Sequence, residues 1–306
     1  MTRSSLDLPQ QSGRLAVITG TGGLGYEAAL VLARAGARVV IAGRNAEKGR
    51  EAVSTIMAAA PQAEVSFEEL DLASLASIER FAVRMIDRGD GIDLLINNAG
   101  IMSPPQRRTT EDGVEMQFGV NHLGHFALTL RLLPLLRQVP TPRVVSVTSL
   151  AQHYAKLDFD DLQSAQNYKP GRAYCASKLV QAMFAIELQR RSDAKGWGLL
   201  SLAAHPGFAT TNLFENGKGG ASLGSLISTR IVGPLLGQSP ADGAKPTLYA
   251  ATSPDIRGGR LYGPKGFMEM KGAPGECDFA KAAKDERDAA RLWQISEDLA
   301  GLRLDA

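Results

Sequence analysis

The sequence predicts an α/β fold with a Rossmann-like, doubly wound sheet, and three observations support that prediction. Short apolar runs alternate with segments of helical composition along the first two-thirds of the chain. The first run, Leu15 to Thr19, lacks polar alternation, as expected of a parallel strand buried on both faces. It passes through a glycine-rich turn into a helix, which is the order of elements in a dinucleotide-binding unit.

Composition excludes several classes of protein. The 306 residues are 44% hydrophobic and 22% charged, which is the balance of a soluble globular protein. The net charge of +2 and the lack of a dense Lys/Arg cluster predict no nucleic-acid partner. Cys175 and Cys277 are too few for a disulfide framework and lack metal-ligand spacing, so a reducing compartment is expected.

Residues 1–13 form a short polar tail without the apolar core of a secretory signal. No window approaches the run of about 18 apolar residues that a membrane-spanning helix needs. We therefore expect a cytoplasmic protein with no membrane span. The catalytic domain is expected to be single and to cover residues 14–306.

The turn after the first apolar run contains Gly20, Gly23 and Gly25, spaced G-x-x-G-x-G, and a helix is expected from Tyr26 to Ala35. A backbone without side chains can approach a pyrophosphate closely. The amino-terminal end of the helix offers free N–H groups and a positive dipole end to it. The turn therefore predicts a dinucleotide site, and a glycine-rich turn without a ligand is the alternative.

The second strand, Arg38 to Ala42, predicts which dinucleotide is preferred. An acidic residue at the end of this strand would bind the ribose hydroxyls of NAD, and none is present. Arg44 follows the strand instead, and an arginine there accommodates the 2′-phosphate of NADP. We therefore predict that NADP is preferred over NAD, unless Arg44 is only a solvated loop residue.

The remaining elements repeat the alternation of strand and helix. Strands are expected at Glu64 to Leu70, Ile92 to Ile96, Val144 to Thr148 and Leu199 to Ala204, and helices at Ala46 to Ala59, at Leu75 to Arg88 and within Gly113 to Arg137. The fourth strand runs into Asn97, Asn98, Ala99 and Gly100, where polar amides beside small residues suit a backbone that turns against a ligand. The pattern predicts a parallel sheet with its ligand across the strand ends.

Tyr174 and Lys178 lie four residues apart in a segment of helical composition, and so share one helical face. A nearby cation is expected to lower the pKa of the phenol, which could then exchange a proton with a carbonyl or alcohol oxygen. Ser149 follows the fifth strand, where its hydroxyl can face the same site. A surface tyrosine beside a solvated lysine is the alternative interpretation of the pair.

His122 and His125 have no matching third ligand nearby, so we predict no metal site and assign them packing or surface roles. His153 and His205 are interpreted as structural or substrate-lining, and Cys175 as a small space-filling residue.

These residues together resemble the short-chain dehydrogenase/reductase family, and most closely its retinol-dehydrogenase-like branch, from Arg14 to about Leu302. The motifs are the glycine turn, Asp71-Leu72, Asn97 to Gly100, Asn121 to Phe126, Ser149, Tyr174 with Lys178, and Pro206-Gly207. One departure is that two residues, not three, separate the first two glycines. NAD therefore remains the alternative cofactor.

The resemblance implies a catalytic tetrad. Tyr174 would be the general acid/base, Lys178 would lower its pKa and bind the nicotinamide ribose, Ser149 would bind the substrate oxygen, and Asn121 would help to hold a water. The cofactor-binding residues implied are Gly20, Gly23, Leu24, Gly25, Arg44, Asp71, Leu72, Asn98, Ala99, Gly100, Tyr174, Lys178, Pro206, Gly207 and Thr210. A seventh strand near Gly259 to Tyr262 and a homo-oligomer packed through the long helices are also implied.

Residues 211–243 are expected to form the substrate-loop region. A glycine-rich run at Asn216 to Gly220 precedes an apolar segment from Leu223 to Leu236. This segment could close as a lid over an apolar substrate, or it could pack on the body or on another subunit. A small apolar carbonyl or alcohol is therefore the expected substrate.

The leading functional hypothesis is an NADP-preferring oxidoreductase that moves a hydride between nicotinamide and an apolar carbonyl or alcohol. Two alternatives are a dinucleotide-binding regulator without turnover and a lyase or epimerase on the same fold.

Overall fold

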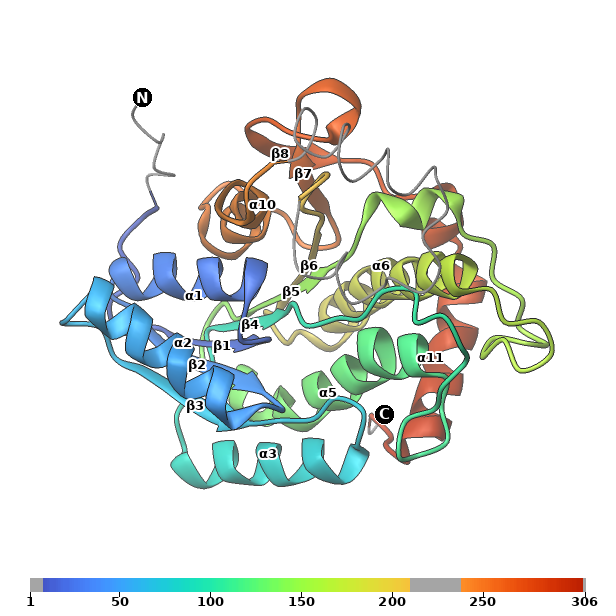
Figure 1. Cartoon of the computed structure of the whole chain (residues 1–306), viewed down its shortest axis with the longest axis horizontal. Helices are drawn as coiled ribbons and strands as arrows, with labels where there is room; N and C mark the ends of the chain where they lie inside the picture. The colour runs from blue at the N-terminus through green and yellow to red at the C-terminus, as the bar shows by residue number, and fades with distance from the viewer. Residues whose placement is uncertain (1–7, 210–237, 305–306) are drawn as a thin grey trace.

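The computed structural model describes residues 8–209 and 238–304 as one central sheet between two layers of helices (Figure 1). The strands are β1 (Leu15–Thr19), β2 (Arg38–Gly43), β3 (Val65–Glu69), β4 (Leu94–Asn97), β5 (Arg143–Val147), β6 (Leu200–Ala204), β7 (Leu261–Pro264) and β8 (Pro274–Cys277). Their order in the sheet is β3-β2-β1-β4-β5-β6-β7-β8. The direction of winding reverses between β1 and β4, and this reversal is where open α/β sheets bind their ligands.

The longer helices alternate with these strands. They are α1 (Gly23–Arg34), α2 (Ala46–Ala59), α3 (Leu75–Arg88), α5 (Gly124–Leu136), α6 (Pro170–Lys195), α10 (Pro240–Thr252) and α11 (Glu286–Ala300). Figure 1 shows α1, α2 and α10 on one face of the sheet and α3, α5 and α6 on the other. The doubly wound sheet predicted from the sequence is thus confirmed.

The inner strands supply residues to two separate cores, because successive side chains point to opposite faces. Val17 and Val40 face the core formed with α3, α5 and α6, and Ile18 and Ile41 face the core formed with α1, α2 and α10. All of β1 is buried. This is the physical reason why the strands appear in the sequence as apolar runs without alternation.

The sheet contains one strand more than expected. β1 to β7 pair in parallel, and β8 is added antiparallel to β7, with Leu261 opposite Cys277. The segment Pro274 to Cys277 contains proline and glycine and has no apolar alternation, so its sequence suggests a turn. It is a strand because the chain doubles back along β7 at the edge of the sheet.

The stretch from Gly113 to Arg137 is not one uniform helix. It contains the short helix α4 (Met116–Phe118), the π-helical turn η1 (Gly119–Leu123) and then α5. Pro134 lies inside α5 without ending it. The π-helical turn contains Asn121, and such turns often occur at functional sites.

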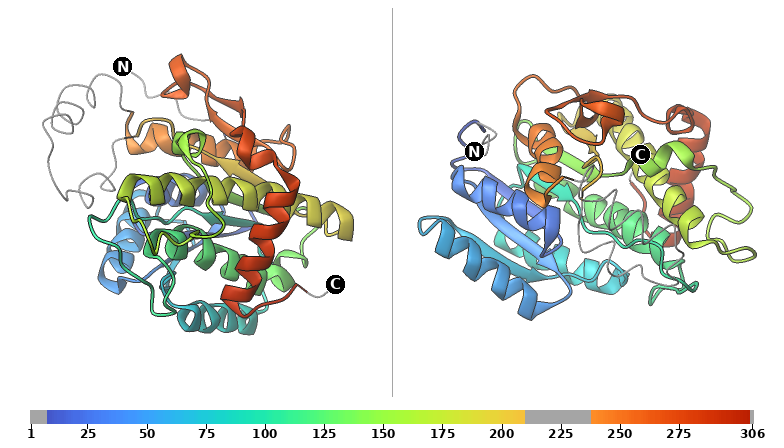
Figure 2. Two further views of the ribbon diagram at one scale, coloured as in Figure 1. Left: turned by 90° about the vertical axis from the view of Figure 1, so that its right-hand side faces the viewer. Right: turned by 45° about the horizontal axis from the view of Figure 1, so that its top comes forward.

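Helix α11 lies across α6 within the same chain, as the left view of Figure 2 shows. The ring of Trp293 stacks on Phe184 with centroids 5.9 Å apart. Part of the α6 surface expected to meet another subunit is therefore covered by the chain itself.

The structure bears only in part on the expected substrate loop and on the expected lack of a membrane span. Of the substrate-loop region, residues 211–237 lie outside the described part of the chain, and Pro240 begins α10. Among the described helices, none combines the length and apolarity needed to cross a membrane.

Candidate active site

The predicted site residues gather at the carboxyl edge of the sheet. Gly20 follows β1, Asn98 follows β4, Ser149 lies two residues after β5, and His205 follows β6. The strands are parallel, so these ends meet along one edge.

The glycine turn is packed too tightly for a side chain at Gly20 or at Gly25. A Cβ on Gly25 would lie 2.5 Å from Nδ2 of Asn98 and 2.8 Å from the carbonyl oxygen of Gly20. Gly20 has a φ of +101° and Gly23 a φ of +54°, in the region that favours glycine. Helix α1 begins at Gly23, three residues earlier than expected, so the last two glycines belong to its first turn.

The amino-terminal end of α1 fits an anionic ligand. Its N-cap, Gly22, has no side chain to cap the first turn, and no acidic residue lies there. The first amides and the positive end of the helix dipole are thus left for a ligand such as the diphosphate of a dinucleotide.

A buried hydrogen-bond network joins this turn to the end of β4. The amides of Asn98 and Ala99 both donate to Oγ1 of Thr19 at 2.9 Å. Thr19 in turn contacts Nε2 of His125 at 2.9 Å, and Nδ1 of His125 lies 3.0 Å from the carbonyl oxygen of Asn121. Burial lowers the pKa of His125 to about 4, so the ring is neutral and can donate from one nitrogen while accepting at the other. Sequence spacing does not reveal this role, because Thr19 and His125 are 106 residues apart in the chain.

The side chain of Asn98 does not point into open space. Its Nδ2 donates to the carbonyl oxygen of Thr19 at 2.8 Å, so it holds the start of the glycine turn. Its role along the adenosine, which the resemblance implies, stays a prediction.

Asn121 ties the loop after β4 to α6. Its Nδ2 donates to the carbonyl oxygen of Ile101 at 3.0 Å and to Oγ of Ser177 at 2.9 Å, and its Oδ1 accepts from the amide of Ile101 at 2.8 Å. A Cβ on Gly100 would lie 3.1 Å from Oδ1 of Asn121 and 3.6 Å from Nζ of Lys178. Asn121 and Lys178 therefore flank the same glycine, and the water-holding role of Asn121 stays a prediction.

Helix α6 presents Tyr174 and Lys178 to the end of β5. Nζ of Lys178 donates to the carbonyl oxygen of Val147 at 3.0 Å and to Oε1 of Gln181 at 2.7 Å, and it lies 5.8 Å from the centroid of the Tyr174 ring. Thr148 donates to the carbonyl oxygen of Lys178 at 2.7 Å, which fixes the helix against the strand. The pair expected from the sequence is therefore brought together.

The pKa values of the pair differ from the expectation. Burial raises the pKa of Tyr174 to about 12, although a hydrogen bond with Ser149 opposes that rise. Burial also lowers the pKa of Lys178 to about 7. Both charged forms lose their hydration on burial, and this loss outweighs any lowering of the phenol pKa by the cation. The ammonium is also held by Val147 and Gln181.

Ser149 lies beside this pair as the N-cap of the short helix η2 (Leu150–Tyr154). Its Oγ accepts from the amide of Ala151 at 3.2 Å, which leaves its hydroxyl hydrogen for another partner.

The residues expected at the adenosine end of the cofactor follow β2 and β3. Arg44 is exposed directly after β2, and no ion pair of its side chain occurs among the described residues. A Cβ on Gly43 would lie 2.8 Å from Cγ2 of Thr21, so the shortened turn lies against the end of β2. Oδ1 of Asp71 accepts from the amide of Ala73 at 2.9 Å, and Leu72 is buried.

The turn expected to receive the nicotinamide follows β6. Gly207 has a φ of +63°, and the carbonyl oxygen of Pro206 accepts from the side chain of Gln238. Leu24 packs from α1 toward this region, since a Cβ on Gly243 would lie 2.8 Å from its Cδ2. Thr210 lies outside the described residues.

Comparisons with known proteins agree with this arrangement. The family model of short chain dehydrogenases matches residues 14–219. Retinol dehydrogenase 13 of Homo sapiens is 40% identical over 297 residues, covering 95% of this chain and 85% of that protein. Polyprenol dehydrogenase of Mus musculus is 41% identical over 295 residues, covering 94% and 83%.

Solved structures agree as well. The crystal structure of an uncharacterised protein from Mycobacterium paratuberculosis has a TM-score of 0.80 at 39% identity, covering 98% of both chains. A short chain dehydrogenase from Escherichia coli CFT073, crystallised with NADPH, has a TM-score of 0.64 at 23% identity, covering 82% of this chain and 96% of that one. The second likeness concerns the fold alone.

Proposed function

The chain belongs to the short-chain dehydrogenase family and is an NAD(P)-dependent oxidoreductase, and we propose that it prefers NADP and acts on small apolar alcohols and carbonyls. One observation supports the catalytic assignment above all others. Tyr174, Ser149 and Lys178 meet at the strand ends, next to a glycine turn whose helix end is open to an anion.

The residues of this chain would perform the proton transfer. In reduction, the phenol of Tyr174 donates its proton to the carbonyl oxygen, while the hydroxyl of Ser149 holds that oxygen in place. In oxidation, Tyr174 accepts the proton of the alcohol. When bound, the nicotinamide cofactor donates or accepts the hydride. Lys178 would stabilise the phenolate and exchange protons with it, since its own pKa is about 7.

Arg44 supports the preference for NADP. It is exposed after β2, where the 2′-phosphate of NADP would lie, and no acidic residue occupies that strand end. Guanidinium groups form strong charge-assisted hydrogen bonds with phosphate, and these bonds are unavailable to NAD.

The names of the relatives support the substrate class. Retinol and polyprenols are apolar alcohols, and proteins named for them are about two-fifths identical to this chain over nearly all of its length. A substrate of this kind agrees with the apolar character of residues 223–236 in the sequence.

The test is a titration of the purified protein with NADPH and NADH, followed by turnover assays with retinal, a polyprenal and short apolar ketones. We expect NADPH to bind more tightly and to be oxidised only when a carbonyl is present. Arg44→Ala should lower the preference for NADPH over NADH roughly tenfold, because one charged hydrogen-bond partner is lost. Arg50→Ala, on the exposed face of α2, is the matched control.

Two results would contradict the proposal. A wild-type protein that prefers NADH would mean that the shortened glycine turn, and not Arg44, selects the cofactor. Binding without turnover on any carbonyl would favour a regulator or a lyase.

A further inference from the structure

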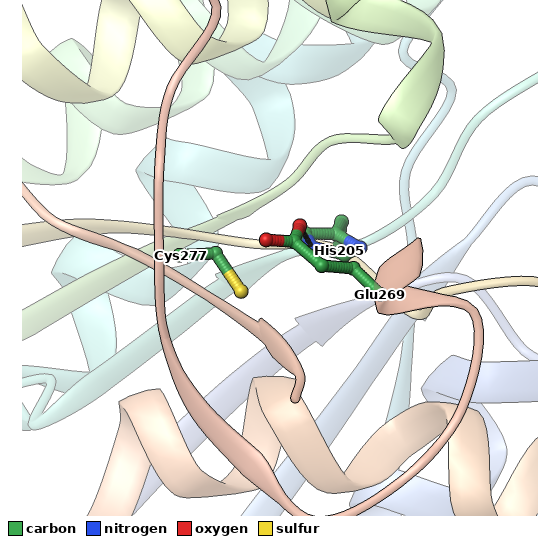
Figure 3. A group of neighbouring side chains, drawn as sticks. All are labelled: His205, Glu269 and Cys277. Carbon is green, nitrogen blue, oxygen red and sulfur yellow. Dashed lines mark hydrogen bonds and ion pairs between the residues drawn. The ribbon is translucent and has the colours of Figure 1, made fainter. Parts of the chain in front are cut away.

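Three side chains with titratable groups meet beside the turn after β6 (Figure 3). His205 follows β6, Glu269 ends the short helix η4 (Phe267–Glu269), and Cys277 ends β8. Nε2 of His205 lies 3.1 Å from Oε2 of Glu269, and the potential ligand atoms of all three residues lie within 4.8 Å of one another. The cluster could hold a metal ion, or it could be a hydrogen-bonded support for the turn.

The protonation of the imidazole decides between these possibilities. The amide of Gly207 donates to Nδ1 of His205 at 3.2 Å, so Nδ1 must carry a lone pair. In the neutral ring the proton is then on Nε2, which donates it to Glu269. A metal-bound histidine normally donates its second N–H to an acceptor, but here the second nitrogen faces a donor. Burial, aided by Glu269, raises the pKa of the Cys277 thiol to about 12, which disfavours a thiolate ligand.

The backbone around Glu269 is bent to bring it to His205. Met268 and Glu269 have φ values of 48° and 55°, in the left-handed region that side-chain-bearing residues rarely adopt. Such strain persists only where the surrounding contacts maintain it. Directly after it, the carbonyl oxygen of Met270 accepts from the amide of Phe208 at 2.9 Å. A Cβ on Gly207 would lie 2.3 Å from that same oxygen, so this segment lies directly against the turn.

The imidazole itself has no freedom to move. His205 is fully buried, and a Cβ on Gly263 of β7 would lie 2.0 Å from its Nε2. Its ring can therefore transmit the position of the Glu269 carboxylate to the amide of Gly207.

We propose that Glu269 is a positioning residue that acts through His205 to hold the Pro206-Gly207 turn in the conformation that receives the nicotinamide end of the cofactor. This inference rests on the proposed function only in taking a nicotinamide dinucleotide as the ligand. Its consequence is that losing Glu269 weakens recognition of the nicotinamide half of the cofactor and spares recognition of the adenosine half.

Two ligands distinguish binding of the nicotinamide half from binding of the adenosine half. NADPH contacts the whole site, and 2′-phospho-ADP-ribose lacks the nicotinamide. For Glu269→Ala we expect the Kd of NADPH to rise roughly tenfold, as for the loss of a charged hydrogen-bond partner, with the Kd of 2′-phospho-ADP-ribose unchanged. Glu269→Gln should recover most of the affinity, because its amide oxygen still accepts from Nε2. Glu276→Ala, on β8 of the same hairpin and paired with Arg257, is the control.

Equal weakening of both ligands, or unchanged binding of NADPH, would overturn the proposal. Failure of the wild-type protein to bind NADPH would instead contradict the proposed function. The contact between His205 and Glu269 can still be tested without any cofactor, by NMR of the imidazole.

The ¹⁵N shifts of the imidazole ring report the tautomer in the wild-type protein, and they do not depend on whether the alanine variant folds. The chain has four histidines, so the His205 signals can be assigned with a single His205→Gln variant. We expect the Nε2–H tautomer. An Nδ1–H tautomer would overturn the proposal, as would one equivalent of zinc that is lost in Glu269→Gln.

Discussion

Tyr174 and Lys178 lie one turn apart on α6, and burial shifts their pKa values in opposite directions, to about 12 and about 7. Because Nζ of Lys178 lies 5.8 Å from the centroid of the Tyr174 ring in a buried site, we expect the two groups to titrate as a pair rather than as independent residues. Below pH 7 both are protonated, and above it the pair loses one proton, chiefly from Lys178. Moving the remaining proton from Tyr174 to Lys178 generates the phenolate without further uptake or release from solvent.

Tyr174→Phe should reduce turnover by roughly 10²- to 10⁴-fold, the usual contribution of a general acid or base. The Kd of NADPH should stay within a few-fold, because the variant removes one hydroxyl and keeps the ring. Steady-state assays and NADPH titration measure the two effects. Tyr154→Phe is the control, since Tyr154 is exposed. Near-normal turnover of Tyr174→Phe would exclude the proposed mechanism.

The pH dependence of alcohol oxidation follows from the pair. Oxidation needs the phenolate of Tyr174, so kcat/KM should rise with pH up to about 7 and then level off, as Lys178 loses its proton. In Lys178→Met the phenol titrates alone, and the rate should keep rising about tenfold per pH unit through pH 9. A pH profile unchanged by Lys178→Met would show that Lys178 does not share the proton.

At the scale of elements, the turn between β1 and α1 depends on close backbone contact rather than on side chains. Asn98 from the end of β4 fills the space beside Gly20 and Gly25, and its amide holds the carbonyl oxygen of Thr19. The turn is therefore shaped by a neighbouring strand as much as by its own glycines.

Gly25→Ala should lower the free energy of unfolding by about 1–3 kcal/mol, the usual cost of overpacking. It should also weaken NADPH binding, because the new Cβ pushes against Asn98 and the backbone of Gly20. Gly22→Ala is the matched control for stability. Its φ is −142° and its Cβ would meet no atom within 4 Å, so the expected cost is only that of replacing glycine by alanine at an N-cap, about 0.5–1 kcal/mol. Urea denaturation of both variants measures the difference, and equal stabilities would contradict the packing argument.

At the scale of the whole molecule, the core formed with α3, α5 and α6 contains a histidine that must stay neutral. His122 lies among Phe118, Phe126 and Phe184, and its Nε2 lies 2.8 Å from Oγ of Ser296 on α11. Burial lowers the pKa of His122 to about 3. In the unfolded chain His122 binds a proton as the pH falls below about 6.5, whereas in the folded protein its ring stays neutral down to about pH 3. The contribution of the neutral, buried ring to the free energy of unfolding is therefore complete above pH 6.5 and declines as the pH falls.

His122→Gln should make the protein less sensitive to acid. Between pH 7 and pH 5 the wild-type protein should lose roughly 2 kcal/mol through this histidine, and a glutamine does not titrate. Urea denaturation at both pH values gives the two losses for comparison. His153→Gln, at an exposed position, controls for substitution as such. An identical loss in His122→Gln and the wild-type protein would show that His122 does not contribute.

Local patterns in the sequence determined the order of elements and the chemistry of the site. Buried parallel strands are apolar throughout, so β1 and β2 were visible as short apolar runs, and α2 and α3 have the predicted bounds. Tyr174 and Lys178 were identifiable because helical spacing alone places them on one face.

Only the tertiary structure decided the pKa values of the site and the side chains that hold its turns in place, because both depend on contacts between residues distant in sequence. The pKa values of Tyr174 and Lys178 follow from burial, which no spacing reveals. The pairing of His205 with Glu269 joins residues on different elements, and β8 is a strand only because β7 lies beside it. Local chemistry is determined by sequence, whereas desolvation and long-range hydrogen bonds arise only when the chain folds.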